Sequence, residues 1–179
     1  MSSPPTDLAR ALLPRIRDIA DYPRPGIVFK DISPLLADPA AFAAAVDAVA
    51  GDRRWGAVNK VVGIEARGFI FAAPVAYRLG AGFVPVRKAG KLPSTTYGES
   101  YELEYGSATI EVHRDAFAPG DSVLIVDDVL ATGGTAAAAR RLVERAGAKV
   151  TGLSVLIELA ALAGRQRLPG LDVDAVLLV

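Results

Sequence analysis

The chain has no cysteine, one histidine, one methionine and one tryptophan among its 179 residues. Without cysteine there can be no disulfide framework, no thiolate zinc site and no cysteine nucleophile. A metal site built from several histidines is excluded within one chain, and a Ser-His-Asp triad would have to use His113. The sequence therefore favours chemistry that needs neither thiol nor imidazole, and we expect His113 to lie on the surface of a strand.

Long apolar runs and an excess of one charge are also missing. No stretch approaches the roughly 18 apolar residues of a membrane helix, and the amino terminus lacks the apolar segment of a signal peptide. Twenty Lys and Arg residues balance twenty Asp and Glu residues. A protein that coats nucleic acid or an anionic membrane would carry a basic excess. We therefore expect a cytoplasmic protein with neither kind of partner.

The chain does contain a regular alternation of apolar segments. Helical spacing predicts helices at 7–20, after Asp38-Pro39, at 69–79 and at 135–146, and β-branched runs predict strands at 58–64, 83–86, 109–113, 123–126, 150–156 and 173–179. Residues 21–38 are rich in proline and 92–106 are polar, so we expect both to be irregular. The alternation predicts one α/β domain with a mostly parallel central sheet flanked by helices, and ligands at the carboxyl ends of its strands.

The segment VLIVDDVLATGGT, residues 123–135, is the most informative. A strand leads into two carboxylates and then into a loop of small residues that opens a helix. Such a loop leaves its backbone N–H groups accessible to a phosphate. The spacing is neither that of a P-loop nor that of a dinucleotide fingerprint. Because Asp127 and Asp128 would repel a lone phosphate, the ligand should also offer ribose hydroxyls or a bridging magnesium ion. A tight turn with an Asp N-cap is the structural alternative.

This segment resembles the signature of the type I phosphoribosyltransferases, which bind 5-phosphoribosyl 1-diphosphate (PRPP). Three further stretches resemble the members of that family that use adenine. They are YPRPGIVFKDISPLL at 22–36, GIEARGFIF at 63–71, and VPVRKAGKLP with YELEYG across 84–106. The resemblance runs from residue 22 to about residue 160. It implies one domain over residues 1–179, with a hood segment at 1–36, a core at 37–179 and a mobile lid at about 89–106.

The resemblance also implies how PRPP is held. Asp127 and Asp128 would hold the ribose hydroxyls. Ala66 and Arg67 would form a pyrophosphate loop that contains a cis non-proline peptide bond. The remaining PRPP contacts would come from the backbone of Ala131, Thr132, Gly133, Gly134 and Thr135 at the 5′-phosphate, and from Arg87, Lys88 and Lys91 at the pyrophosphate. A solvated basic surface is the alternative for these last three residues.

Catalysis and base recognition complete the implied site. Glu104 would exchange a proton with N7 of the purine, Tyr105 would lie near the ribose, and Arg67 would assist catalysis. Phe29 would stack on adenine, Leu159 would close its other face, and the backbones of Val28 and Lys30 would read its edge. A core position for Phe29 and an outward-facing Glu104 remain alternatives. The lid tip, Ser94 to Glu99, has no match in the family.

The implied reaction transfers the 5-phosphoribosyl group to adenine, giving AMP and pyrophosphate in purine salvage. Magnesium would arrive with the pyrophosphate of PRPP and lie near Asp127 and Asp128, and the family implies a homodimer. Two alternatives stay open. One is transfer to another base, such as xanthine or orotate. The other is a PRPP-sensing regulator on the same fold.

Overall fold

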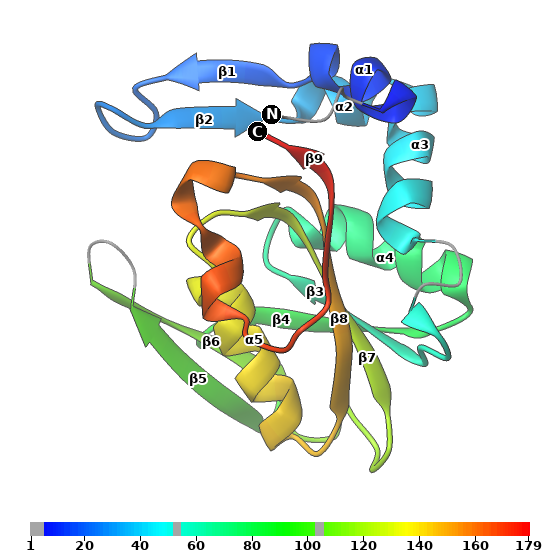
Figure 1. Cartoon of the computed structure of the whole chain (residues 1–179). Helices are drawn as coiled ribbons and strands as arrows, with labels where there is room; N and C mark the ends of the chain where they lie inside the picture. The colour runs from blue at the N-terminus through cyan, green and yellow to red at the C-terminus, as the bar shows by residue number, and fades with distance from the viewer. Residues whose placement is uncertain (1–5, 52–54, 103–105) are drawn as a thin grey trace. The chain divides into compact units, whose positions relative to one another are not determined.

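The computed structural model describes residues 6–51, 55–102 and 106–179 and divides into two compact units, one up to Ala48 and one from Val49 to Val179 (Figure 1). The first unit holds helix α1 (Asp7–Leu12), the 3-10 turn η1 (Leu13–Arg15), strands β1 (Arg17–Ala20) and β2 (Val28–Asp31), and helix α2 (Ser33–Ala37). Helix α3 (Pro39–Ala50) ends in the second unit. Strands β1 and β2 pair as an antiparallel hairpin.

The predicted helix over 7–20 is wrong beyond its first turns. Thr6 caps α1 by accepting a hydrogen bond from the backbone N–H of Ala9, but Pro14 lacks a backbone donor, and within a continued helix its ring would clash with the turn before it. The chain becomes extended at Ile16 and continues as β1. The prediction that residues 21–38 are irregular is also wrong in part, because this segment contains β2 and α2.

The second unit contains the predicted α/β sheet. Its described strands follow the order β5-β6-β4-β3-β7-β8-β9, with β3 (Lys60–Ile64), β4 (Gly82–Lys88), β5 (Thr96–Glu102), β6 (Ser107–His113), β7 (Ser122–Leu130), β8 (Lys149–Glu158) and β9 (Val173–Leu178). Pairing is parallel from β4 through β3, β7 and β8 to β9 and antiparallel at β6 and β5. Helices α4 (Gly68–Leu79) and α5 (Gly134–Arg145) flank it.

Residues 96–102 were expected to be irregular, and they form strand β5. Every residue of β5 pairs with β6, from Thr96 opposite His113 to Glu102 opposite Ser107. Arg141 of α5 also donates to Glu99, with Nε 2.6 Å from Oε1. Polar residues can therefore form this strand because cross-strand pairing and a helix behind it hold them. Motion of a lid in this region stays a prediction.

Two further details differ from the sequence expectations. Strand β7 runs to Leu130, so Asp127 and Asp128 lie within the strand and not after it. His113 does lie on a strand, but it is only partly exposed, and its Nε2 atom is buried without a hydrogen-bond partner among the described residues. None of the helices described here is long or apolar enough to cross a membrane.

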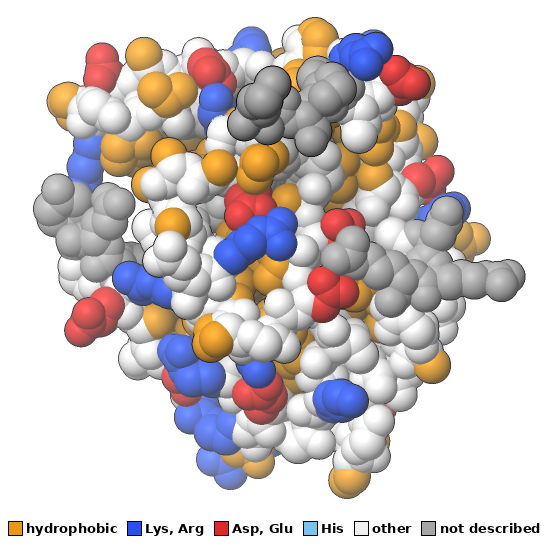
Figure 2. Space-filling model, in the orientation of Figure 1, with side chains coloured by type: hydrophobic (Ala, Val, Ile, Leu, Met, Phe, Trp, Pro, Cys, Tyr) orange, Lys and Arg blue, Asp and Glu red, His pale blue; other side chains and the backbone are white. Residues whose placement is uncertain are grey.

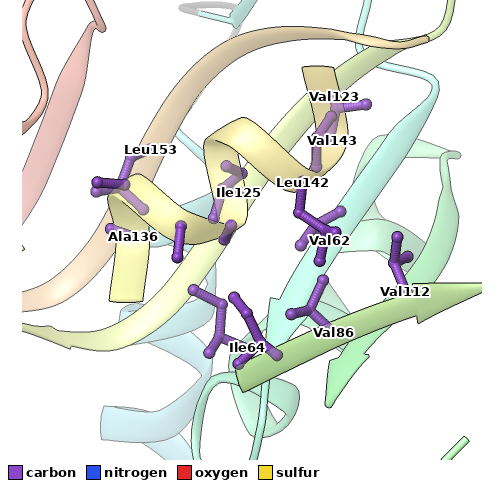
Figure 3. Packing of buried hydrophobic residues seen from close by; sticks show 14 of the residues in the cluster. Val62, Ile64, Val86, Val112, Val123, Ile125, Ala136, Leu142, Val143 and Leu153 are labelled. Atoms are coloured by element: carbon purple, nitrogen blue, oxygen red, sulfur yellow. The ribbon is translucent and has the colours of Figure 1, made fainter. Parts of the chain in front are cut away.

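The core of the second unit lies between the sheet and α5 (Figure 3). Val62 and Ile64 point to this side and pack with Leu142 of α5, which is fully buried. The alternate residue Gly63 faces α4, since a Cβ there would lie 2.7 Å from the Cβ of Ala72. The central strands are therefore covered on both faces, which leaves their carboxyl ends as the place for a site.

Leu142→Ala should lower the free energy of unfolding by about 2–5 kcal/mol, because it opens a cavity in a fully buried cluster. Chemical denaturation measures the change. Glu144→Ala, at an exposed position of the same helix, should cost less than about 1 kcal/mol. Equal losses from the two variants would show that α5 does not contribute this core.

Candidate active site

Three parallel strands end at one edge of the sheet and bring charged residues together there. Gly63 of β3 is paired with Val126 of β7, and Ile64 is paired with Val86 of β4. The segments that follow or end these strands therefore meet, although they are about 20 to 60 residues apart in the chain. The segment after β3 and the end of β7 line a cleft of about 420 Å³, whose lining residues are Ile64, Glu65, Ala66, Arg67, Tyr101, Asp127, Asp128, Val129, Ala131 and Thr135.

The two carboxylates of β7 are held in a tight arrangement. The Asp127 Oδ1 atom accepts a hydrogen bond of 2.9 Å from the backbone N–H of Asp128. Asp128 is buried, and its Oδ2 atom lies 2.8 Å from Nε of Arg67, within ion-pair distance. Burial raises the pKa of both carboxyl groups, the neighbouring Asp128 raises that of Asp127 further, and Arg67 opposes the rise at both. A ligand that donates hydrogen bonds to Asp127 and Asp128 would offset the free-energy cost of burying their negative charge.

Glycine allows the start of α4 to approach this pair. A Cβ at Gly68 would lie 2.7 Å from Oδ1 of Asp127 and 3.1 Å from the carbonyl oxygen of Val126. The helix can therefore begin directly beside Asp127. The peptide bond between Glu65 and Ala66, just before this helix, is cis, as the family resemblance implied.

The small-residue loop lies between β7 and α5 and encloses a pocket of about 80 Å³. Gly133 has a φ of +80°, which favours glycine, and α5 begins at the next residue. A Cβ at Gly133 would also collide with the backbone carbonyl of Gly164. The first N–H groups of a helix have no partner within it, so this loop offers donors to an anion, and phosphate binding there stays a prediction.

The basic residues at the end of β4 form a closed turn. Arg87 Nη1 donates to the carbonyl oxygen of Lys91 over 3.0 Å, and the Lys91 N–H donates to that of Lys88. The Lys91 Nζ atom lies 2.6 Å from Oε1 of Glu65. On the face that Figure 2 shows, Lys and Arg side chains likewise lie beside Asp and Glu side chains. The zero net charge of the chain thus includes local pairs of opposite charge.

The remaining predicted residues fall into three groups. Leu159 follows β8, partly exposed, and donates its N–H to the carbonyl of Leu130 over 2.9 Å. Val28, Phe29 and Lys30 belong to β2 in the first unit, where the ring of Phe29 packs edge-on against Tyr22 at 5.2 Å between ring centroids. Glu104 and Tyr105 lie outside the described residues.

Comparison with known proteins decides the family. The model of the phosphoribosyl transferase domain matches residues 35–174, which is most of the chain. The chain belongs to the phosphoribosyltransferase family. It is 68% identical to the adenine phosphoribosyltransferase of Acidothermus cellulolyticus over 176 residues, 98% of this chain and 99% of the relative. It is 60% identical to that of Streptomyces coelicolor over 179 residues, 98% of each chain.

Solved structures of phosphoribosyltransferases share this fold. The adenine phosphoribosyltransferase of Rhodothermus marinus is 54% identical, with a TM-score of 0.92 over 96% of this chain and 98% of the other. The enzyme of Saccharomyces cerevisiae, solved with adenine and an imino-altritol bisphosphate, is 38% identical, with a TM-score of 0.89 over 94% of this chain and 98% of the other. The predicted fold class is thereby confirmed.

The sequence reasoning missed Glu65 and Tyr101, which both line the cleft of this phosphoribosyltransferase. Glu65 could have been found, because it directly follows a buried strand as a carboxylate at the ligand-binding edge. Tyr101 gave no comparable signal. Its place depends on the pairing of β5 with β6, where it lies opposite Ala108.

Asp127→Asn should raise Tm at neutral pH by a few degrees, because it removes a carboxylate that folding makes harder to ionise. The pKa of Asp127 is raised in the folded protein. The destabilisation caused by its charge is therefore absent below the ordinary pKa of 3.8 and grows as the pH rises above that value. Thermal unfolding of both proteins between about pH 4 and pH 8 measures the difference in Tm. Asp115→Asn, at an exposed turn, is the control. A Tm for Asp127→Asn below that of the wild type at neutral pH would contradict the assignment.

Proposed function

We propose that this phosphoribosyltransferase transfers the 5-phosphoribosyl group of PRPP to adenine, giving AMP and pyrophosphate in purine salvage. The observation that carries the proposal is the strand β7, whose two carboxylates lead into the small-residue loop before α5. Hydroxyl-binding and phosphate-binding groups are thus adjacent, as a phosphorylated ribose requires. Adenine is supported as the base because the relatives at 68% and 60% identity are adenine phosphoribosyltransferases.

The ribose 5-phosphate part of PRPP is held by β7 and its loop. Asp127 and Asp128 accept hydrogen bonds from the 2′ and 3′ hydroxyls, which offsets the burial of the acidic pair. The backbone N–H groups of residues 131–135 donate to the 5′-phosphate at the start of α5. The contacts at the hydroxyls and at the 5′-phosphate together fix the position of C1′ of the ribose for attack.

The pyrophosphate part is held by Ala66, Arg67 and the cations of the turn 87–91. The charge on Arg67 already faces the cleft beside Asp128, where ribose and pyrophosphate would adjoin. Magnesium prefers oxygen ligands and is commonly held by one or two carboxylates together with substrate phosphates. Asp127 and Asp128 fit such an ion, since the buried Oδ2 of Asp128 accepts no hydrogen bond from the described residues beyond its ion pair with Arg67. Magnesium bound with the pyrophosphate would neutralise charge on the leaving group.

In the reaction, N9 of adenine forms a bond to C1′ as the bond from C1′ to the pyrophosphate oxygen breaks. The transition state has oxocarbenium character, and no covalent enzyme intermediate is needed. Glu104 exchanges the proton at N7, which leaves N9 as the nucleophile. Phe29 and Leu159 stack on the two faces of adenine, the backbones of Val28 and Lys30 read its edge, and Tyr105 lies at the ribose. A lid over about residues 89–106 excludes water, since hydrolysis would otherwise compete.

The organisation of the chain is part of the proposal. Residues 1–179 form one phosphoribosyltransferase domain with a hood at 1–36 and a core at 37–179. The family match over residues 35–174 supports the core. A homodimer and a cytoplasmic location are further expectations that come from the family resemblance and the composition.

The proposed activity predicts magnesium-dependent release of pyrophosphate from PRPP with adenine and AMP as the second product. The purified protein should be assayed with adenine, hypoxanthine, xanthine and orotate, and kcat/KM for adenine should exceed the others by at least about a hundredfold, roughly 2.7 kcal/mol of discrimination. A preference for another base would replace adenine as the substrate. Sequence-specific DNA binding without turnover would favour the regulator.

Glu104→Gln should lower kcat by about a hundredfold or more while leaving PRPP binding within about threefold, because proton transfer contributes roughly 10²–10⁴ to the rate. Single-turnover kinetics and calorimetric titration with PRPP separate the two effects. Glu102→Gln, at an exposed position two residues earlier, should retain the wild-type rate. An unchanged single-turnover rate for Glu104→Gln would remove its role in proton transfer.

A further inference from the structure

Glu65 is a carboxylate to which the proposed mechanism assigns no role, although it lies at the cations assigned to pyrophosphate. Its side chain is only 8% exposed and lines the cleft. We propose that Glu65 is a positioning residue that holds Arg87 and Lys91 in the arrangement in which they bind the pyrophosphate of PRPP. This inference rests on the proposed function.

One carboxylate reaches three residues of the basic turn. The Oε1 atom of Glu65 lies 2.6 Å from Nζ of Lys91. The Oε2 atom accepts a hydrogen bond of 2.9 Å from the backbone N–H of Lys88 and lies 3.4 Å from Nε of Arg87. Although burial raises the pKa of Glu65, hydrogen bonds from Lys91 and from the Lys88 N–H, together with the nearby guanidinium of Arg87, lower it to about 2. Glu65 therefore carries its charge throughout the neutral range.

These contacts order side chains that are otherwise costly to fix. A lysine or arginine side chain has many rotamers, and binding must offset the entropy lost on fixing one of them if the side chain is not already held. The Nζ group of Lys91 has three donors and the guanidinium of Arg87 has five, so the contacts to Glu65 leave donors for a second anion. The pairing thus prepares both cations without saturating them.

A carboxylate beside these cations also reduces their positive potential, which would weaken the binding of an anion. The turn contains three cations, Arg87, Lys88 and Lys91, against the two carboxylates of Glu65 and Glu111. The segment therefore keeps a positive excess toward pyrophosphate, which carries several negative charges. We infer that ordering outweighs the loss of potential, so that removing the charge of Glu65 weakens binding.

Glu111 provides a matched control from the other side of the same turn. Its Oε2 atom accepts a hydrogen bond of 3.0 Å from the backbone N–H of Gly90. It forms no ion pair with the residues that the structure describes. Replacing Glu111 therefore loosens the backbone of the turn without changing the partner of a cation. A comparison with Glu65 separates the ordering of cations from the general stability of the turn.

The experiment compares Glu65→Gln with Glu111→Gln in steady-state kinetics and in calorimetric titration with magnesium pyrophosphate. Glu65→Gln should raise KM for PRPP and Kd for pyrophosphate about tenfold, which corresponds to about 1.4 kcal/mol. It should leave kcat and KM for adenine within about twofold, and Glu111→Gln should leave all four constants within about twofold. Glu65→Asp, which keeps the charge, should give a smaller rise than Glu65→Gln.

The outcomes separate this inference from the function on which it rests. A wild-type protein that forms no AMP from adenine and PRPP would refute the proposed function. An active wild type with an unchanged or lower KM for PRPP in Glu65→Gln would overturn the positioning role alone, as would equal effects from the two Gln variants. If Glu65→Gln does not fold, the KM for PRPP and the kcat of Glu65→Asp decide on the positioning role instead. A raised KM with unchanged kcat would support the role, and an unchanged KM would overturn it.

Discussion

The parallel pairing of β3 with β4 and β7 is the constraint on which the rest of the site depends. Parallel strands end at the same edge of a sheet, so a single register fixes where three distant segments meet. Gly63 opposite Val126 and Ile64 opposite Val86 set that register. The loop after β3 and the acidic pair of β7 then line one cleft, and Glu65 of that loop contacts the basic turn at the end of β4. Covering the sheet with α5 on one face and α4 on the other keeps the strands apolar until these ends.

Opposite charges at this edge hold one another in place. Arg67 lies against Asp128, and Lys91 lies against Glu65. The first pair is costly, because its charges are taken out of water and the pKa values of Asp127 and Asp128 are raised, whereas the contacts of Glu65 lower its pKa to about 2. What the two pairs share is that each orients a cation at this edge. The groups that would bind a charged, hydroxylated ligand are fixed before the ligand arrives, and for Asp127 and Asp128 this is at some expense to the fold.

The sequence predicted what depends on neighbouring residues and missed what depends on distant ones. The string at 123–135 was interpreted correctly as a strand, a small loop and a helix, because all its signals lie within 13 residues, although the strand extends through the acidic pair to Leu130. Strand β5 was missed because its polar residues are held by β6 and by Arg141, which is 42 residues from its partner Glu99. Strand β1 was missed because Ile16 and Ile19 also fit helical spacing, and Pro14 decided between the two. The pairing of Arg67 with Asp128 joins residues too far apart for any local pattern.

The close packing of Gly133 against Gly164 limits how this protein could be redesigned. Gly133 belongs to the proposed phosphate loop, whereas Gly164 lies five residues after Leu159, at the start of the 3-10 turn η4 (Gly164–Arg167). No side chain fits between the two backbones. Libraries that reshape residues 160–167 to admit a bulkier base must therefore keep Gly164, or they would displace the anion-binding loop as well. Evolution of base selectivity is thereby confined to the residues around Gly164, while this glycine itself stays tied to the capture of the sugar phosphate.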